Sequence, residues 1–261
     1  MRRDLALILI AVVQLAAPAL ANAAPGYAWQ FSPGEQTLEQ RFPPPPGFVR
    51  PGAAPNSWAA WLRGLPMKPA KSPVLIYTGA QKWRQDVHAA VIDIDVGKRD
   101  LQQCADAIMR LRAEWLFAAS RKQEIGFNDT EGKRLSFSAR RDSGYASFRK
   151  YMDYVFAYAG TYSLARELKP APLPTLRAGD VFIKGGFPGH AVLVADVVEN
   201  AQTGEKRFLL VQSYMPAQEM HVLKNPAATD GSPWYAAAFD GDLVTPEWRF
   251  AAGSLRRWPS R

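Results

Sequence analysis

The sequence contains little cysteine and little histidine, and both shortages limit the chemistry it can perform. Cys104 is the single cysteine among 261 residues, and there are three histidines. One cysteine excludes a disulfide framework and a cysteine-ligated zinc site, because both need several thiols. Three histidines leave little room for a histidine-rich metal centre. We therefore expect the protein to work without a metal ion or an organic cofactor.

The sequence also lacks the compositional extremes of non-globular proteins. Hydrophobic residues make up 48% and charged residues 21%, which excludes a wholly disordered chain, a collagen-like repeat and a coiled coil. The net charge is +8, but Lys and Arg are scattered, with no long basic run. Nucleic acid is therefore not an expected partner. We expect the positive charge mainly to keep the protein soluble. The alternative is that it attracts the protein to anionic surfaces.

The N-terminal residues have the pattern of an export signal. Two arginines precede an apolar stretch over residues 5–20, and Ala21-Asn22-Ala23 places small residues where a signal peptidase reads them. Pro18 disfavours an uncleaved membrane-spanning helix. We predict a signal peptide over residues 1–23 and a periplasmic or extracellular protein that is not stably inserted in the membrane.

The remaining chain is predicted to form an arm and one domain. Residues 24–56 are rich in Pro and Gly and include four consecutive prolines, a run that forms neither helix nor sheet ladder. Residues 57–261 are expected to fold as a single α+β domain, because predicted helices come first and predicted antiparallel strands follow. We expect this domain to be monomeric.

Apolar periodicity predicts the elements of the domain. Spacings of three and four residues predict a long amphipathic helix from Leu101 to about Ser120, with Asp100 as its N-cap. Ser57 is expected to cap a short helix carrying Trp58 and Leu62. Strands or strand-like pieces are expected at 74–78, 88–96, near Ile125 and at 135–137, helices at 148–159 and 163–168, and an antiparallel meander at 181–183, 190–198 and 207–214.

Three side chains in this pattern fit a cysteine hydrolase. Cys104 lies in the first turns of the predicted helix, and His190 begins a strand directly after a glycine-rich loop. A helix N-terminus favours a thiolate and offers free N–H groups to an oxyanion. The imidazole takes the thiol proton. Gln212, on the following predicted strand, is a polar group that can fix the imidazole tautomer.

Cys104 and His190 also have structural interpretations. Cys104 falls on the apolar stripe of its helix, where cysteine commonly serves as a small hydrophobic residue. A free thiol in an exported protein has no disulfide partner, which favours a function. His190 follows Gly189, so it can instead be a turn histidine that hydrogen-bonds the backbone. Both interpretations stay open.

The third position of the triad has more than one candidate. Gln212 alternates with Phe208 and Leu210, so it should point inward and be hydrogen-bonded, which a buried structural amide would also explain. His221 is a reserve candidate. Asp196 should lie about 20 Å along the strand from the predicted base, which is too far for the orienting residue.

One segment resembles a known histidine motif. The run AGDVFIKGGFPGHAVLVADV looks like that of papain-like cysteine peptidases of the bacterial cell-wall type, the NlpC and CHAP kinds. In those families a cysteine starts a helix, and the histidine follows a glycine-rich hairpin on a strand introduced by Gly-Asp. The resemblance implies a papain-like fold with a long helix on an antiparallel sheet. It also implies Cys104 as nucleophile, His190 as base, Gln212 as orienting residue, and an amide or peptide bond of peptidoglycan as substrate.

The sequence departs from that motif at two points. The cysteine and the histidine are 86 positions apart, so residues 121–175 must be an insertion. Cys104 stands in Gln-Gln-Cys-Ala-Asp instead of the usual Asp-Cys-Ser or Gln-Cys-Trp. With Asp100 as cap, the cysteine would also lie too deep in the helix for the strongest terminus effect.

A closer resemblance covers roughly residues 40–255. The runs AAVIDIDVGKRDLQQCADAIMRLRAE, VFAYAGTYSL, GDVFIKGGFPGHAVLVADV and LLVQSYMPAQ, together with SPWY and TPEW, are similar to the exported bacterial family called domain of unknown function 4846. This resemblance implies export and a single domain. It implies no particular activity.

Two other function classes remain open. A non-catalytic binding module would keep the same fold and stack its aromatic side chains, among them eight Trp and nine Tyr, on a glycan or a peptide. A metal-dependent hydrolase would use His88, Asp93 and Asp95, although a fourth convincing ligand is missing. Asp93 and Asp95 are better explained as the solvated face of a strand.

Overall fold

The computed structural model describes residues 26–32 and 35–259. The predicted signal peptide, residues 1–23, lies outside these ranges. Within them, no helix is both long enough and apolar enough to cross a membrane.

A large antiparallel sheet forms the centre of the protein. Across the described residues its eight strands follow the order β1–β8–β7–β6–β5–β12–β4, with β9 added beside β7, and all pairings are antiparallel. The strands are β1 (His88–Val91), β4 (Lys169–Pro170), β5 (Val181–Lys184), β6 (His190–Glu199), β7 (Lys206–Gln212), β8 (His221–Leu223), β9 (Tyr235–Ala236) and β12 (Leu255–Arg257). The predicted meander is thus confirmed as β5, β6 and β7.

Apolar cores lie on both faces of this sheet. Strand β6 is buried along nearly its whole length, which explains why its sequence is mostly apolar. Ala191 and Leu193 belong to the larger core, which includes the apolar side of the helices. Val192 and Val194 belong to a second core, completed by the hairpin of β10 (Leu243–Val244) and β11 (Arg249–Phe250).

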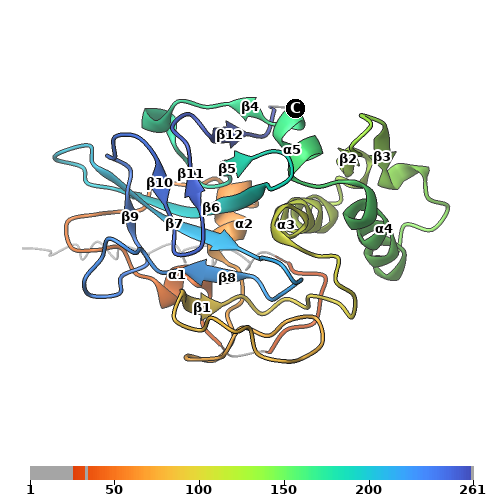
Figure 1. Ribbon diagram of the computed structural model, residues 1–261, viewed down its shortest axis with the longest axis horizontal. Helices are drawn as coiled ribbons and strands as arrows, with labels where there is room; N and C mark the ends of the chain where they lie inside the picture. Colours follow the sequence, from red (N-terminus) through yellow and green to blue (C-terminus); the bar gives the residue numbers. More distant parts are fainter. Residues whose placement is uncertain (1–25, 33–34, 260–261) are drawn as a thin grey trace, which may run out of the picture.

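Five α-helices accompany the sheet in the described part of the chain. They are α1 (Leu38–Arg41), α2 (Trp58–Arg63), α3 (Cys104–Ala118), α4 (Tyr145–Tyr158) and α5 (Thr161–Glu167). Figure 1 shows α3 beside the sheet, with α4 and the hairpin of β2 (Gly126–Asn128) and β3 (Arg134–Ser136) beyond it, far from β9 and β10. The predicted cap of α2 is confirmed, since Ser57 Oγ accepts a hydrogen bond from the Ala60 N–H.

Helix α3 begins three residues later than the sequence predicts. The carboxylate of Asp100 does not cap it, because its Oδ1 accepts hydrogen bonds from the Ala217 N–H at 2.6 Å and from Gln103 Nε2 at 3.0 Å. Gln103 is the N-cap instead, and its N–H donates to Asp106 Oδ2 at 3.1 Å. Cys104 is therefore the first residue of the helix. Since α3 has 15 residues and α4 has 14, the expected long helix is not confirmed.

Two predicted strands also differ from the observed structure. The strand expected over 88–96 is regular only through Val91, because the Asp93 N–H donates to the Pro66 carbonyl and the Ile94 N–H turns back to Ile92. The segment 74–78 makes isolated bridges, one with Gln81 and one with Gln218, and forms no strand. Each difference includes a contact with a residue outside the local pattern, Pro66 in the first case and Gln218 in the second.

The proline-rich arm packs onto the domain. Its segment before the four prolines forms α1, and Leu38, Phe42 and Phe48 are buried in the larger core. Arg50 Nε donates to the buried Asp196 carboxylate at 2.7 Å. The arm is therefore held by both apolar burial and an ion pair.

Candidate active site

A cleft of about 450 Å³ opens where α3 begins. Cys104 lines it from the first turn of α3, and His190 lines it from the first position of β6. The loop between β5 and β6 forms part of its wall, together with Tyr214 and Trp248. The fold thus brings the predicted nucleophile and the predicted base into one cleft across 86 positions of sequence.

The Cys104 thiol is buried at the helix terminus. Its side chain lies among the backbone N–H groups of Cys104, Ala105 and Ala191, which favour the thiolate. Burial nevertheless outweighs them and raises the pKa of Cys104 to about 11. Within the described residues, no hydrogen bond joins this thiol to His190. The resting group is therefore a neutral thiol.

The position of His190 depends on the glycine before it. A Cβ atom at Gly189 would lie 2.4 Å from the Gly186 carbonyl oxygen and 2.7 Å from that of Lys184. Only glycine allows the loop to pass this close to its own carbonyl groups and then enter β6. The Gly-His pair seen in the sequence is thus explained by close backbone approach.

The His190 imidazole is enclosed by aromatic rings and is neutral at pH 7. Its ring centroid lies 4.7 Å from that of Tyr214, 5.2 Å from Trp248 and 5.7 Å from Phe250. Burial lowers the pKa of His190 to about 4, although the hydrogen bond with Gln212 acts in the opposite direction. A neutral imidazole is the form that can accept a proton.

Gln212 joins His190 to a chain of hydrogen bonds with a defined direction. Gln212 Oε1 lies 3.0 Å from His190 Nε2, and Gln212 Nε2 donates to Glu247 Oε2 at 2.7 Å. Gln212 Nε2 also lies 3.3 Å from His221 Nε2, and His221 Nδ1 lies 2.9 Å from the Glu219 carbonyl. A carbonyl and a carboxylate only accept, so His221 carries its proton on Nδ1 and Gln212 donates at both contacts.

This direction determines the His190 tautomer. Because the amide nitrogen of Gln212 is used in donation, its oxygen must accept, and His190 therefore carries its proton on Nε2. Nδ1 is left unprotonated, with no hydrogen-bond partner among the described residues. The burial and hydrogen bonding predicted for Gln212 are confirmed, since its exposed fraction is 1%.

Sequence reasoning missed Glu247 and Lys82. Glu247 lies between β10 and β11, and both of its carboxylate oxygens are 2.5 Å from Lys82 Nζ. The two side chains are only 8% and 3% exposed. No local pattern in the sequence links position 82 with position 247.

The Gly-Asp pair and Asp196 have structural roles outside the cleft. Gly179 has φ of +93°, and a Cβ there would meet the Trp58 indole at 2.2 Å. Asp180 pairs with Arg257 at 2.7 Å and so ties β12 to the beginning of β5. Asp196 pairs with two arginines of the arm and α2. These residues hold the scaffold that positions β6.

The residues of the metal hypothesis are engaged separately. Asp95 pairs with Arg110 and Arg149, each at 3.0 Å. Asp93 Oδ2 accepts a hydrogen bond from a backbone N–H at 2.7 Å, and His88 Nε2 lies 3.2 Å from a backbone carbonyl. Across 26–32 and 35–259, no group of three or more His, Cys, Asp or Glu side chains is placed to hold a metal ion.

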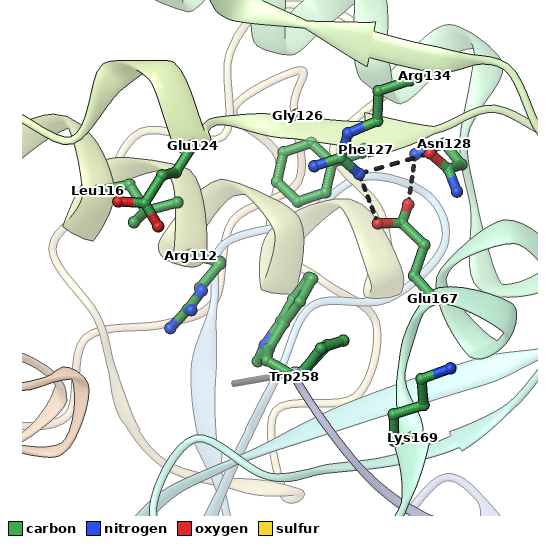
Figure 2. Close-up of a pocket in the computed structure, with 11 residues that line it drawn as sticks. Arg112, Leu116, Glu124, Gly126, Phe127, Asn128, Arg134, Glu167, Lys169 and Trp258 are labelled. Atoms are coloured by element: carbon green, nitrogen blue, oxygen red, sulfur yellow. Dashed lines mark hydrogen bonds and ion pairs between the residues drawn. The ribbon is translucent and has the colours of Figure 1, made fainter. Parts of the chain in front are cut away.

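A second cavity, of about 310 Å³, lies beside α3 and the β2–β3 hairpin. Figure 2 shows Arg134 directed at Glu167 and Asn128 on one side and Trp258 near Arg112 on another. Arg134 donates to Glu167 at 2.8 Å. The lining includes neither a cysteine nor a histidine, so we place the candidate chemistry in the first cleft.

These features define a mixed α/β protein built on a large antiparallel sheet, with a thiol and an imidazole in one cleft. The chain belongs to the family described as domain of unknown function (4846), whose model matches residues 38–141 and 136–257. The matched segments include Cys104, His190 and Gln212. No curated protein and no solved structure gives a significant match to the chain.

Proposed function

We propose that the protein is an exported cysteine hydrolase, an amidase or endopeptidase with a papain-like arrangement of helix and sheet. Cys104 is the nucleophile, His190 the general base, and Gln212 the residue that orients the imidazole. The observation that carries the proposal is the hydrogen bond from His190 Nε2 to Gln212 Oε1. It leaves Nδ1 as a proton acceptor in the cleft that Cys104 also lines.

The first step begins from two neutral groups. As Cys104 Sγ forms a bond to the substrate carbonyl carbon, the thiol proton passes to His190 Nδ1 and the C=O π electrons move to oxygen. Backbone N–H groups at the start of α3 stabilise this oxyanion. Apo enzymes often have loose contacts between nucleophile and base that tighten when substrate binds, which fits the lack of a direct thiol–imidazole hydrogen bond.

The second step releases the products. The imidazolium returns its proton to the leaving amine as the C–N bond breaks, which leaves a thioester on Cys104. Water then gives a proton to Nδ1 and attacks the thioester carbon. The C–S bond breaks, the sulfur recovers a proton, and the carboxylic acid leaves. The overall reaction is amide plus water to amine plus acid.

We infer a peptide substrate, and a peptide of the cell wall in particular, from two supports. Phe187 is 90% exposed and Met215 is 61% exposed, and both line the cleft. They offer apolar contact to the side chains of a bound peptide. The wall assignment comes from the resemblance of the histidine segment to NlpC- and CHAP-type enzymes and from the predicted export signal.

The test is the pH dependence of alkylation by iodoacetamide, which labels one site because Cys104 is the single cysteine. At pH 7 a thiol of pKa about 11 would be only about one part in ten thousand thiolate. We expect the native protein to be alkylated faster than this thiolate fraction alone would allow. In His190→Ala the alkylation rate should fall to the value that the fraction allows. His88→Ala, outside the cleft, is the matched control. A thiol that reacts only after unfolding would sink the hydrolase.

A non-catalytic binding module is the second candidate. It is favoured by the burial of the thiol and by the exposed apolar rim at Phe187 and Met215. In that case Cys104→Ala should bind wall peptides as the native protein does, and neither should hydrolyse them. Loss of hydrolysis in Cys104→Ala with binding retained supports the enzyme.

A further inference from the structure

We propose that Glu247 and Lys82 are positioning residues, a buried ion pair that holds the Gln212 amide in the orientation that keeps His190 Nδ1 unprotonated. The catalytic consequence of this inference rests on the proposed function. The tautomer that it assigns does not, because it follows from hydrogen bonds within the protein alone.

The pair lies directly behind Gln212. Glu247 Oε2 accepts the Gln212 Nε2 hydrogen bond at 2.7 Å, and Lys82 Nζ contacts both oxygens of the same carboxylate at 2.5 Å. Lys82 precedes β1, Gln212 ends β7, and Glu247 lies between β10 and β11. Three distant segments therefore converge on one side-chain amide.

Glu247 supplies the asymmetry that an amide by itself lacks. A glutamine amide can rotate by 180° and exchange its donor and acceptor ends, and an imidazole can satisfy either end by changing tautomer. An ionised carboxylate accepts only, so a rotated amide would place oxygen against oxygen in a buried site. Lys82 Nζ, which only donates, contacts both oxygens of this carboxylate, so both oxygens are held as acceptors. The rotated state is thus excluded.

The same hairpin also holds the imidazole ring in place. Trp248 follows Glu247 and packs 5.2 Å from His190, and Phe250 of β11 packs 5.7 Å from it. One connection between two short strands thus sets both the position of the ring and the orientation of the amide. His221 adds a weaker constraint of the same direction, at 3.3 Å from Gln212 Nε2.

The tautomer can be read by nitrogen-15 NMR of the histidine rings in the full chain, which has three histidines. His88→Gln and His221→Gln variants assign the signals. In the native protein we expect a protonated Nε2 and an unprotonated Nδ1 at His190. A protonated Nδ1 would overturn the proposal without the need for any variant of the pair.

Variants then test the pair itself. Glu247→Gln is isosteric, but its amide can accept or donate, so we expect both His190 tautomers to be present. The double variant Lys82→Met/Glu247→Gln removes both charges together and so avoids an unpaired buried charge. Glu167→Gln, which breaks the Arg134 ion pair beside the second cavity, is the matched control and should leave the tautomer unchanged. An unchanged tautomer in both Glu247 variants would also overturn the proposal.

Reactivity separates this inference from the proposed function. With a mixed tautomer, the alkylation rate of Cys104 at pH 7 should fall by about tenfold to hundredfold, the range seen when hydrogen-bond partners that orient metal-binding histidines are lost. If the tautomer changes but alkylation responds to neither Glu247→Gln nor His190→Ala, the positioning role is supported and the hydrolase is rejected.

Discussion

His190 Nε2 and Gln212 Oε1 are 3.0 Å apart, at the beginning of β6 and the end of β7. The two strands pair antiparallel, so residues 22 positions apart in the sequence meet where β6 begins and β7 ends. This one contact ties the imidazole to the chain of hydrogen bonds behind it. The predictions below follow from that chain and from the burial of its members.

Replacing Gln212 with leucine should destabilise the protein by about 2–3 kcal/mol. The change keeps the side-chain volume but leaves His190 Nε2 and Glu247 Oε2 without the partner they have now, and buried polar groups without partners are costly. Urea unfolding measures the difference. Gln202→Leu, on an exposed turn, is the control, and equal midpoints for the two variants would contradict the prediction.

The contributions of His190 and His221 to stability should fall as pH drops below about 6.5. Burial lowers the pKa of His190 to about 4 and that of His221 to about 3, so between these values and 6.5 the unfolded chain binds more protons than the folded one. Stability from each ring is therefore complete above pH 6.5 and decreases on acidification, by about 2 kcal/mol each at pH 5.

Urea midpoints at pH 7 and pH 5 test this linkage. His221→Gln removes one titrating ring, so the loss of stability between pH 7 and pH 5 should be about 2 kcal/mol smaller in this variant than in the native protein. A stability difference between pH 7 and pH 5 that is the same in His221→Gln as in the native protein would show that the pKa of His221 is not depressed.

On acidification, the contribution of His190 to the alkylation of Cys104 should be lost near pH 4. A histidine of ordinary pKa would lose it near pH 6.5. His190 serves as base only while neutral, and its lowered pKa keeps it neutral down to about pH 4. Alkylation rates from pH 3.5 to 8, divided by the rates of His190→Ala, isolate the contribution of the imidazole. A ratio that already declines through pH 6.5 would mean an imidazole of ordinary pKa.

Gly189→Ala should cost at least about 2 kcal/mol and should disturb the cleft. The added Cβ would lie 2.4 Å and 2.7 Å from two carbonyl oxygens and 2.3 Å from Thr161 Oγ1, so the loop before His190 must move. Gly52→Ala, where nothing lies within 4 Å of the added Cβ, is the control. Compared with Gly52→Ala, Gly189→Ala should have both a lower unfolding temperature and a lower rate of Cys104 alkylation.

Local patterns in the sequence were sufficient for several elements. The cap of α2 at Ser57, the body of α3 and the meander of β5, β6 and β7 follow from capping and periodicity, which act over a few residues. The inward direction of Gln212 follows from the same alternation. These features need no knowledge of the rest of the chain.

Only the tertiary structure decided the electrostatics of the site. Asp100 is drawn from the helix cap to the Ala217 N–H, which makes Cys104 the first residue of α3. Burial then outweighs the favourable helix terminus and raises the thiol pKa. Lys82 and Glu247 meet across 165 positions. The sequence determined which groups are present, whereas long-range packing determined their solvation and partners, and these set protonation in a buried site.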